Sequence, residues 1–201
     1  MKLQQPMTDK KHSEIWVAPN ILSMLRILCV PVFLLFLLKQ RSGAALAVFI
    51  VASCTDFLDG FIARTWNLQT RLGKFLDPAA DKMLMAVSYI FLSAPSLGYA
   101  NTLPLWLTAL VFGRDVYIVG CAFLLYKKIQ KKVIHVLLLG KITTVFQMGV
   151  IFLVLLFNTL GQSPGFLRWM YLITAALTAL SGIGYARQGT KMLEEYGPHK
   201  E

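Results

Sequence analysis

The sequence predicts an all-α integral membrane protein with six transmembrane helices. Hydrophobic residues make up 56% of the 201 residues and charged residues only 15%, whereas a soluble domain carries about 25% charged residues. Apolar stretches also recur along the chain, with lengths close to the ~20 residues that a helix needs to cross a bilayer. These stretches are residues 21–38, 44–62, 72–93, 103–126, 137–157 and 167–185.

The first apolar stretch differs from the others because it is short and contains Arg26. Its leading part, residues 16–25, is predicted to lie along the membrane interface as an N-terminal amphipathic segment. Residues 1–14 and 187–201 are polar. We therefore expect one six-helix domain at residues 15–186, with a polar cytosolic segment at each end.

The distribution of Lys and Arg predicts the orientation in the membrane, because basic residues are concentrated on the cytosolic side. If the N-terminus is cytosolic, the opposite side receives only Lys39, Arg41 and Arg168. The cytosolic side receives Lys2, Lys10, Lys11, Arg64, Arg71, Lys74, Lys82, Lys127, Lys128, Lys131, Lys132, Arg187, Lys191 and Lys200. This asymmetry predicts two cytosolic termini. Separately, we expect the membrane to be of the bacterial inner or plasma type.

The net charge of +10 does not indicate a nucleic-acid-binding protein. The basic clusters flank the predicted spans, where they contact anionic lipid headgroups, and no basic stripe with interleaved aromatic residues occurs. Cys29, Cys54 and Cys121 lie singly in apolar surroundings, without the spacing of a zinc site or a disulfide framework. We expect neither.

Four of the ten acidic residues fall in one short window, at Asp56, Asp59, Asp77 and Asp81. Carboxylates inside a membrane are costly and mark functional sites, and four close together repel one another unless cations lie between them. Hard oxygen ligands of this kind suit Mg²⁺ or Mn²⁺. Two such ions can clamp a displacement at phosphorus. The window therefore predicts a divalent metal site at the cytosolic face of the membrane.

The spacing of these aspartates predicts how they come together. Asp56 and Asp59 are three residues apart at the end of the second apolar stretch, and Asp77 and Asp81 are four apart at the start of the third, so each pair shares one helical face. The polar link between them is short enough to return the chain to the same side. Pro78 marks either a first helical turn with Asp77 as its cap or a kink.

Small residues lie beside the carboxylates. Gly60 and Ala63 are one helical turn apart, next to Asp56 and Asp59, so that a flat or phosphorylated ligand can approach the backbone closely. Gly73 serves the same end or permits close helix packing. Arg64 is a fixed cation placed to bind a phosphate oxygen.

The whole pattern, Asp-x2-Asp-Gly-x2-Ala-Arg-x8-Gly-x3-Asp-x3-Asp at residues 56–81, resembles the defining motif of the CDP-alcohol phosphatidyltransferase family at all eight fixed positions. Family members have about this length and six transmembrane helices, and the resemblance implies a homodimer. It also implies a role in phospholipid biosynthesis: a phosphatidyl group moves from CDP-diacylglycerol to an acceptor hydroxyl, and CMP is released.

The resemblance also implies roles for the residues of the motif. Two divalent ions, Mg²⁺ or Mn²⁺, are expected on the four aspartates, and Asp81 is expected to be the base that takes the proton of the acceptor. The residues expected to contact CDP-diacylglycerol are Asp59, Gly60, Ala63, Arg64 and Gly73. Because no covalent nucleophile occurs in the motif, we expect a single in-line displacement.

The acceptor is predicted less directly. Arg114 and Lys141 are cations within apolar stretches and are candidates to bind the phosphate of glycerol 3-phosphate. Alternatively, Arg114 pairs with Asp115 and Lys141 extends to the interface. Residues 20–26 and 140–147 resemble the phosphatidylglycerolphosphate synthases of the family and favour glycerol 3-phosphate, whereas Arg114-Asp115 resembles its cardiolipin synthases, whose acceptor is phosphatidylglycerol.

Two other classes fit the sequence less well. A cation transporter would explain buried aspartates but not the Gly60, Ala63, Arg64 and Gly73 spacing, and neither an inverted repeat nor broken helices are evident. An intramembrane prenyltransferase also uses aspartate-bound Mg²⁺, but the aspartate motifs of that family lie much further apart.

Overall fold

The computed structural model describes residues 18–65, 73–129 and 137–196, and the side chains of residues 24–55, 82–123 and 137–192. In these ranges the chain is helical and contains no strand, which confirms the predicted all-α class. Each α-helix falls on one predicted apolar stretch. The elements are α2 (Ala18–Leu38), α3 (Ser42–Thr65), α4 (Gly73–Leu92), the 3₁₀ helix η1 (Pro95–Leu97), α5 (Leu105–Ile129), α6 (Leu138–Leu160) and α7 (Leu167–Tyr196).

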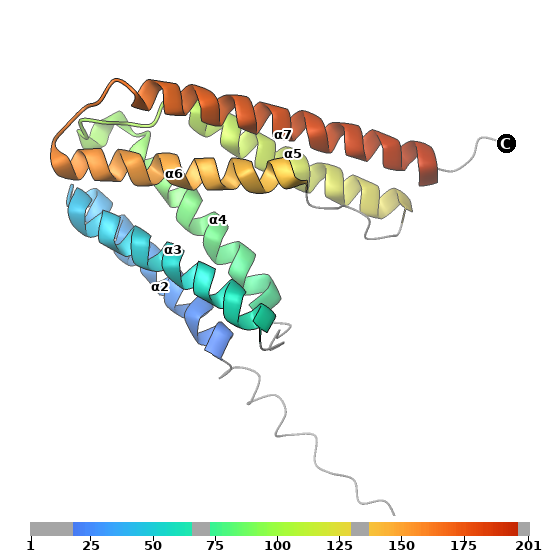
Figure 1. Cartoon of the computed structure of the whole chain (residues 1–201), viewed down its shortest axis with the longest axis horizontal. Helices are drawn as coiled ribbons and strands as arrows, with labels where there is room; N and C mark the ends of the chain where they lie inside the picture. The colour runs from blue at the N-terminus through green and yellow to red at the C-terminus, as the bar shows by residue number, and fades with distance from the viewer. Residues whose placement is uncertain (1–17, 66–72, 130–136, 197–201) are drawn as a thin grey trace, which may run out of the picture. The chain divides into compact units, whose positions relative to one another are not determined.

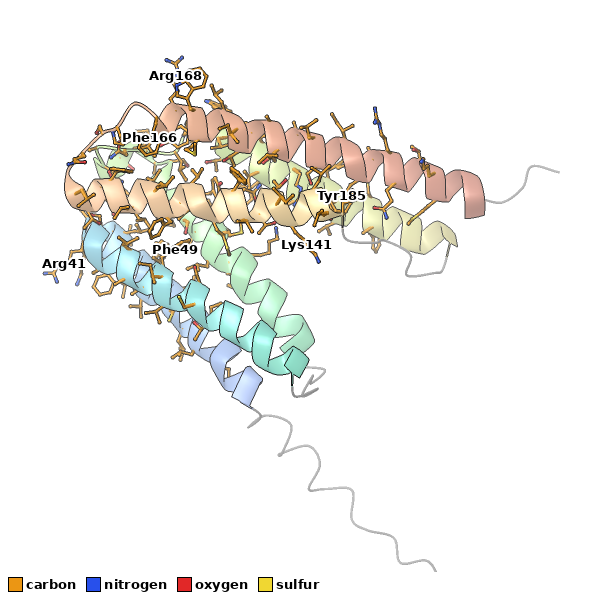
Figure 2. All side chains as sticks on the ribbon, in the orientation of Figure 1. Arg41, Phe49, Lys141, Phe166, Arg168 and Tyr185 are labelled. Carbon is orange, nitrogen blue, oxygen red and sulfur yellow. The ribbon has the colours of Figure 1, made fainter. Side chains whose placement is uncertain are left out.

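The chain divides into two compact units, Met1–Leu92 and Ser93–Glu201. In the first, α2 packs against both α3 and α4 (Figure 1). A three-residue turn joins α2 to α3, and the N–H of Arg41 there donates to the carbonyl oxygen of Phe36 at 2.9 Å. Gln40 has a φ of 54°, the left-handed conformation that reverses a chain quickly. The turn makes α2 and α3 an antiparallel hairpin, from which Arg41 projects outward (Figure 2).

The buried residues of the first unit recur with a helical period along each helix. On α2 the buried positions are Arg26, Val30, Phe33 and Leu37, and on α3 they are Ala45, Phe49 and Ala52. The rings of Phe33 and Phe49 lie 6.1 Å apart between centroids. Steps of three and four residues keep these side chains on one face of each helix. On α4 the buried residues are Leu84, Met85, Ser88, Tyr89 and Leu92.

In the second unit, α5 and α6 both pack against α7 (Figure 1). Its core holds apolar residues of α6, with Val154 and Leu155 fully buried. An amide pair ties the η1–α5 connection to the end of α6: the backbone N–H of Asn101 donates to Oδ1 of Asn158 at 2.8 Å, and Nδ2 of Asn158 donates to the carbonyl oxygen of Asn101 at 2.9 Å. These bonds fix the loops at that end of the unit.

Three helices in the described ranges are long and apolar enough to cross a membrane: Leu105–Phe123, Leu138–Leu160 and Leu167–Met192. The apolar parts described in the first unit, Met24–Leu38, Ser42–Thr55 and Lys82–Leu92, are shorter. These lengths support an integral membrane protein. Six transmembrane spans stay a prediction.

One local expectation differs from the structure, and two others stay predictions. Helix α7 continues to Tyr196, so most of the predicted polar tail is helical, and its cytosolic location stays a prediction. From Ala18 onward the predicted interfacial segment is the unbroken start of α2, residues 16 and 17 lie outside the described ranges, and its position at the membrane interface stays a prediction. Helix α4 begins at Gly73, so Asp77 is not its N-cap, because a cap residue lies just before the first helical turn.

Candidate active site

All eight fixed residues of the motif lie in helices of the first unit. Asp56, Asp59, Gly60, Ala63 and Arg64 belong to the second half of α3, which ends at Thr65. Gly73, Asp77 and Asp81 belong to the first half of α4, which begins at Gly73. The predicted arrangement, one pair closing a helix and the other opening the next, is confirmed for the backbone. The side chains of residues 56–81 lie outside the described ranges, so the metal ligand set stays a prediction.

The helical period relates the aspartate positions to the buried faces. On α3 the buried positions 45, 49 and 52 are continued at steps of four and three residues by positions 56 and 59. On α4 the buried positions 84, 85, 88 and 92 are continued in the other direction by positions 81 and 77. All four aspartates therefore occupy positions that extend the packed faces of these two helices. Among the side chains that the structure describes, no group of three His, Cys, Asp or Glu residues occurs.

Arg26 is fully buried in α2, the helix that packs against both motif helices. A guanidinium is almost never buried without a counter-charge. Residues 24–55 and 82–92, the described side chains of this unit, include no acidic residue. From the sequence, no role is predicted for Arg26 beyond a resemblance, although its steps of four residues to Val30 and seven to Phe33 indicate a buried position.

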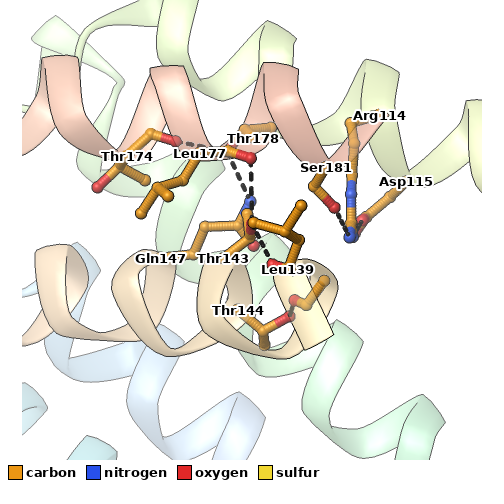
Figure 3. A network of polar contacts seen from close by, with 11 residues as sticks. Arg114, Asp115, Leu139, Thr143, Thr144, Gln147, Thr174, Leu177, Thr178 and Ser181 are labelled. Atoms are coloured by element: carbon orange, nitrogen blue, oxygen red, sulfur yellow. Dashed lines mark hydrogen bonds and ion pairs between the residues drawn. The ribbon is translucent and has the colours of Figure 1, made fainter. Parts of the chain in front are cut away.

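Arg114 in α5 is also largely shielded from solvent, with 9% of its side chain exposed. Nη1 lies 2.9 Å from Oδ1 of Asp115, and Nη2 donates to Oγ of Ser181 in α7 at 2.8 Å (Figure 3). The guanidinium carbon lies 5.5 Å from the ring centroid of Tyr185, within the range of a cation–π contact. The Asp115 pairing, one of the two alternatives from the sequence, is thus present. Nε has no hydrogen-bond partner in the described part of the chain.

Gly140 is the point at which α6 meets this cluster. A Cβ at this position would lie 2.7 Å from the hydroxyl oxygen of Tyr185 and 3.2 Å from Nη2 of Arg114. Glycine therefore lets Tyr185 and Arg114 approach the α6 backbone. Neither Ser181 nor Tyr185 was singled out from the sequence, since they lie far from Arg114 along the chain and only helix packing brings the three together.

Lys141 follows Gly140 but points elsewhere. It is exposed at the first turn of α6, whereas Arg114 is largely shielded from solvent, and Figure 2 shows its side chain projecting from that end of the helix. The exposure agrees with the alternative in which Lys141 extends to the interface. A role in acceptor binding stays a prediction for both cations.

A polar seam runs between α6 and α7 beside Arg114 (Figure 3). Nε2 of Gln147 donates to Oγ1 of Thr178 at 3.2 Å, and Oγ1 of Thr143 lies 3.1 Å from the carbonyl oxygen of Leu177. Thr143, Gln147 and Thr178 are fully buried. Small and polar residues of this kind hold transmembrane helices together, so the seam is a packing contact.

Comparison with known protein families identifies the family of this chain. The family model described as CDP-alcohol phosphatidyltransferase matches residues 16–180. The chain belongs to the CDP-alcohol phosphatidyltransferase family. The matched region contains the whole aspartate motif, Arg26, Arg114 and Lys141.

The curated relatives fall under two names. The chain is 45% identical over 109 residues to a protein named cardiolipin synthase (CMP-forming) from Rattus norvegicus, which covers 54% of this chain and 34% of that protein. The protein of that name from Streptomyces coelicolor is 39% identical over 114 residues, covering 54% and 51%. A protein named CDP-diacylglycerol–glycerol-3-phosphate 3-phosphatidyltransferase from Cereibacter sphaeroides is 35% identical over 160 residues, covering 76% and 69%. The matches to the two cardiolipin synthases therefore span about a third and a half of their lengths.

Proposed function

We propose that this protein transfers a phosphatidyl group from CDP-diacylglycerol to the hydroxyl group of a glycerol-based acceptor, with Mg²⁺ or Mn²⁺ as cofactor. The observation that carries the proposal is the complete family motif on two helices that pack on one partner, α2. Four carboxylates suit hard divalent ions, which complete their coordination with phosphate oxygens.

The motif residues divide the chemistry between them. Asp56, Asp59, Asp77 and Asp81 would hold two divalent ions, which supply charge neutralisation at the pyrophosphate. Gly60, Ala63, Arg64 and Gly73, together with Asp59, would bind the nucleotide end of CDP-diacylglycerol. The two groups overlap at Asp59.

The transfer is a single displacement. Asp81 takes the proton of the acceptor hydroxyl, whose oxygen forms a bond to the β-phosphorus of CDP-diacylglycerol. The bond between that phosphorus and the bridging oxygen breaks, and CMP leaves with the bonding electrons. A carboxylate placed beside the acceptor hydroxyl can serve as the general base of such a transfer.

Our first candidate for the acceptor is glycerol 3-phosphate, which would give phosphatidylglycerol phosphate. The relative named for that acceptor matches 76% of this chain, and residues 20–26 and 140–147 resemble such enzymes. Arg114 and Lys141 would then bind the phosphate of the acceptor.

Phosphatidylglycerol is the second candidate, and the Arg114–Asp115 contact favours it. Asp115 already balances the charge of Arg114 at 2.9 Å. This weakens the attraction of Arg114 for an anion, and the weakening costs a dianionic phosphate more than it costs the monoanionic diester of phosphatidylglycerol. The relatives named cardiolipin synthase also have the higher identities, 39% and 45%, over about half of this chain.

The finer features of the family belong to the same proposal. We expect six transmembrane spans, a homodimer, and a motif that faces the cytosol. Lys39, Arg41 and Arg168 are exposed at the ends of helices predicted to lie on the opposite side, as the positive-inside rule requires. Cysteine accessibility at Arg41→Cys and Lys141→Cys, probed in intact vesicles, tests whether the two positions face opposite sides.

Product identification tests the function. Purified protein in detergent receives CDP-diacylglycerol labelled in its acyl chains, Mg²⁺, and either glycerol 3-phosphate or phosphatidylglycerol. Labelled phosphatidylglycerol phosphate supports the first acceptor, and labelled cardiolipin supports the second. No labelled product with either acceptor, from protein that still unfolds cooperatively, contradicts the proposal.

A further inference from the structure

We propose that Arg26 is the fixed counter-charge of Asp56 and positions that carboxylate at the edge of the metal site. Arg26 is therefore a positioning residue, which acts through Asp56 rather than on the substrate. The pairing itself does not depend on the proposed function; only its importance for metal binding does.

The register of the α2–α3 hairpin carries the inference. The two helices are antiparallel, and the contact between the rings of Phe33 and Phe49, 6.1 Å between centroids, fixes which residues lie at the same level. Arg26 precedes Phe33 by seven residues, and Asp56 follows Phe49 by seven. Seven residues are two helical turns, or about 10.5 Å along each axis, so Arg26 and Asp56 are level with each other.

The other buried residues of the hairpin follow the same register. From the Phe33–Phe49 level, Val30 on α2 and Ala52 on α3 are each three residues further along toward the motif, and both are buried. In the other direction, Leu37 and Ala45 are each four residues away, and both are fully buried. The buried residues of α2 and of α3 are thus spaced equally along the two helices. The next pair in this series is Arg26 on α2 and position 56 on α3.

Charge gives the second reason. Arg26 is fully buried, and a buried guanidinium without a counter-charge would be very costly. The acidic residues of the first unit are Asp9 and Glu14, which precede α2, and the four aspartates of the motif. Of the motif aspartates, Asp56 is the one that the hairpin register brings level with Arg26. The planar guanidinium can hold a carboxylate by two parallel hydrogen bonds.

The pairing would stabilise the site while no divalent ion is bound. Before metal binds, four carboxylates repel one another, and a fixed cation at one side reduces that repulsion and keeps Asp56 in place. When metal is bound, Asp56 retains oxygen lone pairs for an ion, because a carboxylate has about four acceptor positions.

A thermodynamic cycle measured without metal tests the pairing. The variants are Arg26→Met, Asp56→Asn and the double variant, and the readout is the thermal unfolding midpoint of purified protein in EDTA. We expect Arg26→Met to lower the midpoint by about 10 °C, because it leaves a buried carboxylate without its cation. The double variant should recover at least half of that loss.

Two controls separate charge from packing. Lysine and methionine have similar lengths, so Arg26→Lys should keep a midpoint near that of the native protein if the charge matters, and should be no better than Arg26→Met if only packing matters. Asp115→Asn, in the other unit, should show no coupling to Arg26→Met. Additive losses with Asp56→Asn, or a larger coupling to Asp77→Asn or Asp81→Asn, overturn the assignment.

Metal addition gives a readout specific to the site. Because a bound divalent ion can replace the missing cation, Mg²⁺ should raise the midpoint of Arg26→Met by at least twice as many degrees as that of the native protein. Equal shifts would overturn the link to the metal site. The cycle in EDTA does not depend on activity, so failed transfer with intact coupling would reject the proposed function while leaving the pairing in place.

Discussion

Two arginines with little exposure among the described side chains, Arg26 and Arg114, have different surroundings. Arg114 is held within the second unit by Asp115 at 2.9 Å, by Ser181 at 2.8 Å and by the ring of Tyr185. Arg26, in the first unit, has no acidic residue among the described side chains around it, and the register of its hairpin leads to Asp56. One arginine has its counter-charge beside it in the sequence, and for the other we propose a counter-charge in the aspartate motif.

The difference shows how each unit uses a buried charge. An arginine neutralised by its neighbour joins α5 to α7 and contributes mainly to packing and to the local field. The proposed pairing of Arg26 with Asp56 would instead link α2 to the proposed metal site. We expect the following substitutions to separate these roles, beginning with the strongest effect.

Substitutions in the motif should separate chemistry from binding. Asp81→Asn should lower the rate of CMP release by about 10²- to 10⁴-fold, the usual contribution of a general base, while nucleotide binding is largely kept. Asp56→Asn should weaken both, because it removes a metal ligand, whereas the ion that Asp81 shares keeps its other aspartate ligands. The measurements are steady-state CMP release and the affinity for CDP-diacylglycerol. An equal loss of affinity in both variants would remove the case for Asp81 as the base.

Removal of Arg114 should lower stability with either acceptor. Arg114→Met leaves Asp115 without its cation, which should cost about 1–3 kcal/mol, less than for a fully buried pair because the Asp115 side chain is 20% exposed. The double variant Arg114→Met/Asp115→Asn should recover much of that loss in a thermal unfolding experiment. If Arg114 also binds the acceptor phosphate, as proposed for glycerol 3-phosphate, the double variant will regain stability but keep a raised KM for that acceptor.

Gly140→Ala should destabilise the second unit by about 1–3 kcal/mol, because the new methyl group overlaps Tyr185 and approaches Arg114. Gly149→Ala in the same helix is the matched control: nothing lies within 4 Å of its Cβ position, and alanine favours a helix over glycine by about 1 kcal/mol. Adding Tyr185→Phe to Gly140→Ala should relieve part of the strain. If the two glycine substitutions have the same effect on the unfolding midpoint, Tyr185 and Arg114 do not lie as close to Gly140 as described.

Thr178→Val removes the acceptor of the Gln147 amide at nearly constant volume. Hydrogen bonds between transmembrane helices contribute about 0.6 kcal/mol on average, so we expect a loss of that size in thermal unfolding. Thr159→Val is the control, since Thr159 is exposed and its hydroxyl bonds to Leu155 of its own helix. A loss above that of the control would identify the seam as an interhelical contact, and equal losses would argue against it.

The parts of this structure that were predictable from the sequence are local. Apolar length located each α-helix of the described ranges, and the fixed spacing from Asp56 to Asp81 indicated the family. Asp115 was predictable as a partner of Arg114 because the two residues are adjacent. Ser181 and Tyr185 were not, since their contact with Arg114 depends on how α5, α6 and α7 pack.

Two other features could not be predicted from the sequence either. The end of α7 at Tyr196 lies beyond the apolar stretch, and hydropathy gives no signal for a helix that continues past the membrane. The level of Arg26 along α3 needed the Phe33–Phe49 contact, because a sequence shows which face of a helix is apolar but not its register against a neighbour.

The most direct test of the account is the metal dependence of CMP release. Purified protein is stripped with EDTA, supplied with CDP-diacylglycerol and both acceptors, and then titrated with Mg²⁺ or Mn²⁺. The account predicts no CMP before metal is added, release that rises with metal, and one CMP for each molecule of lipid product. Unchanged release in EDTA, or no release at any metal concentration from correctly folded protein, would contradict it.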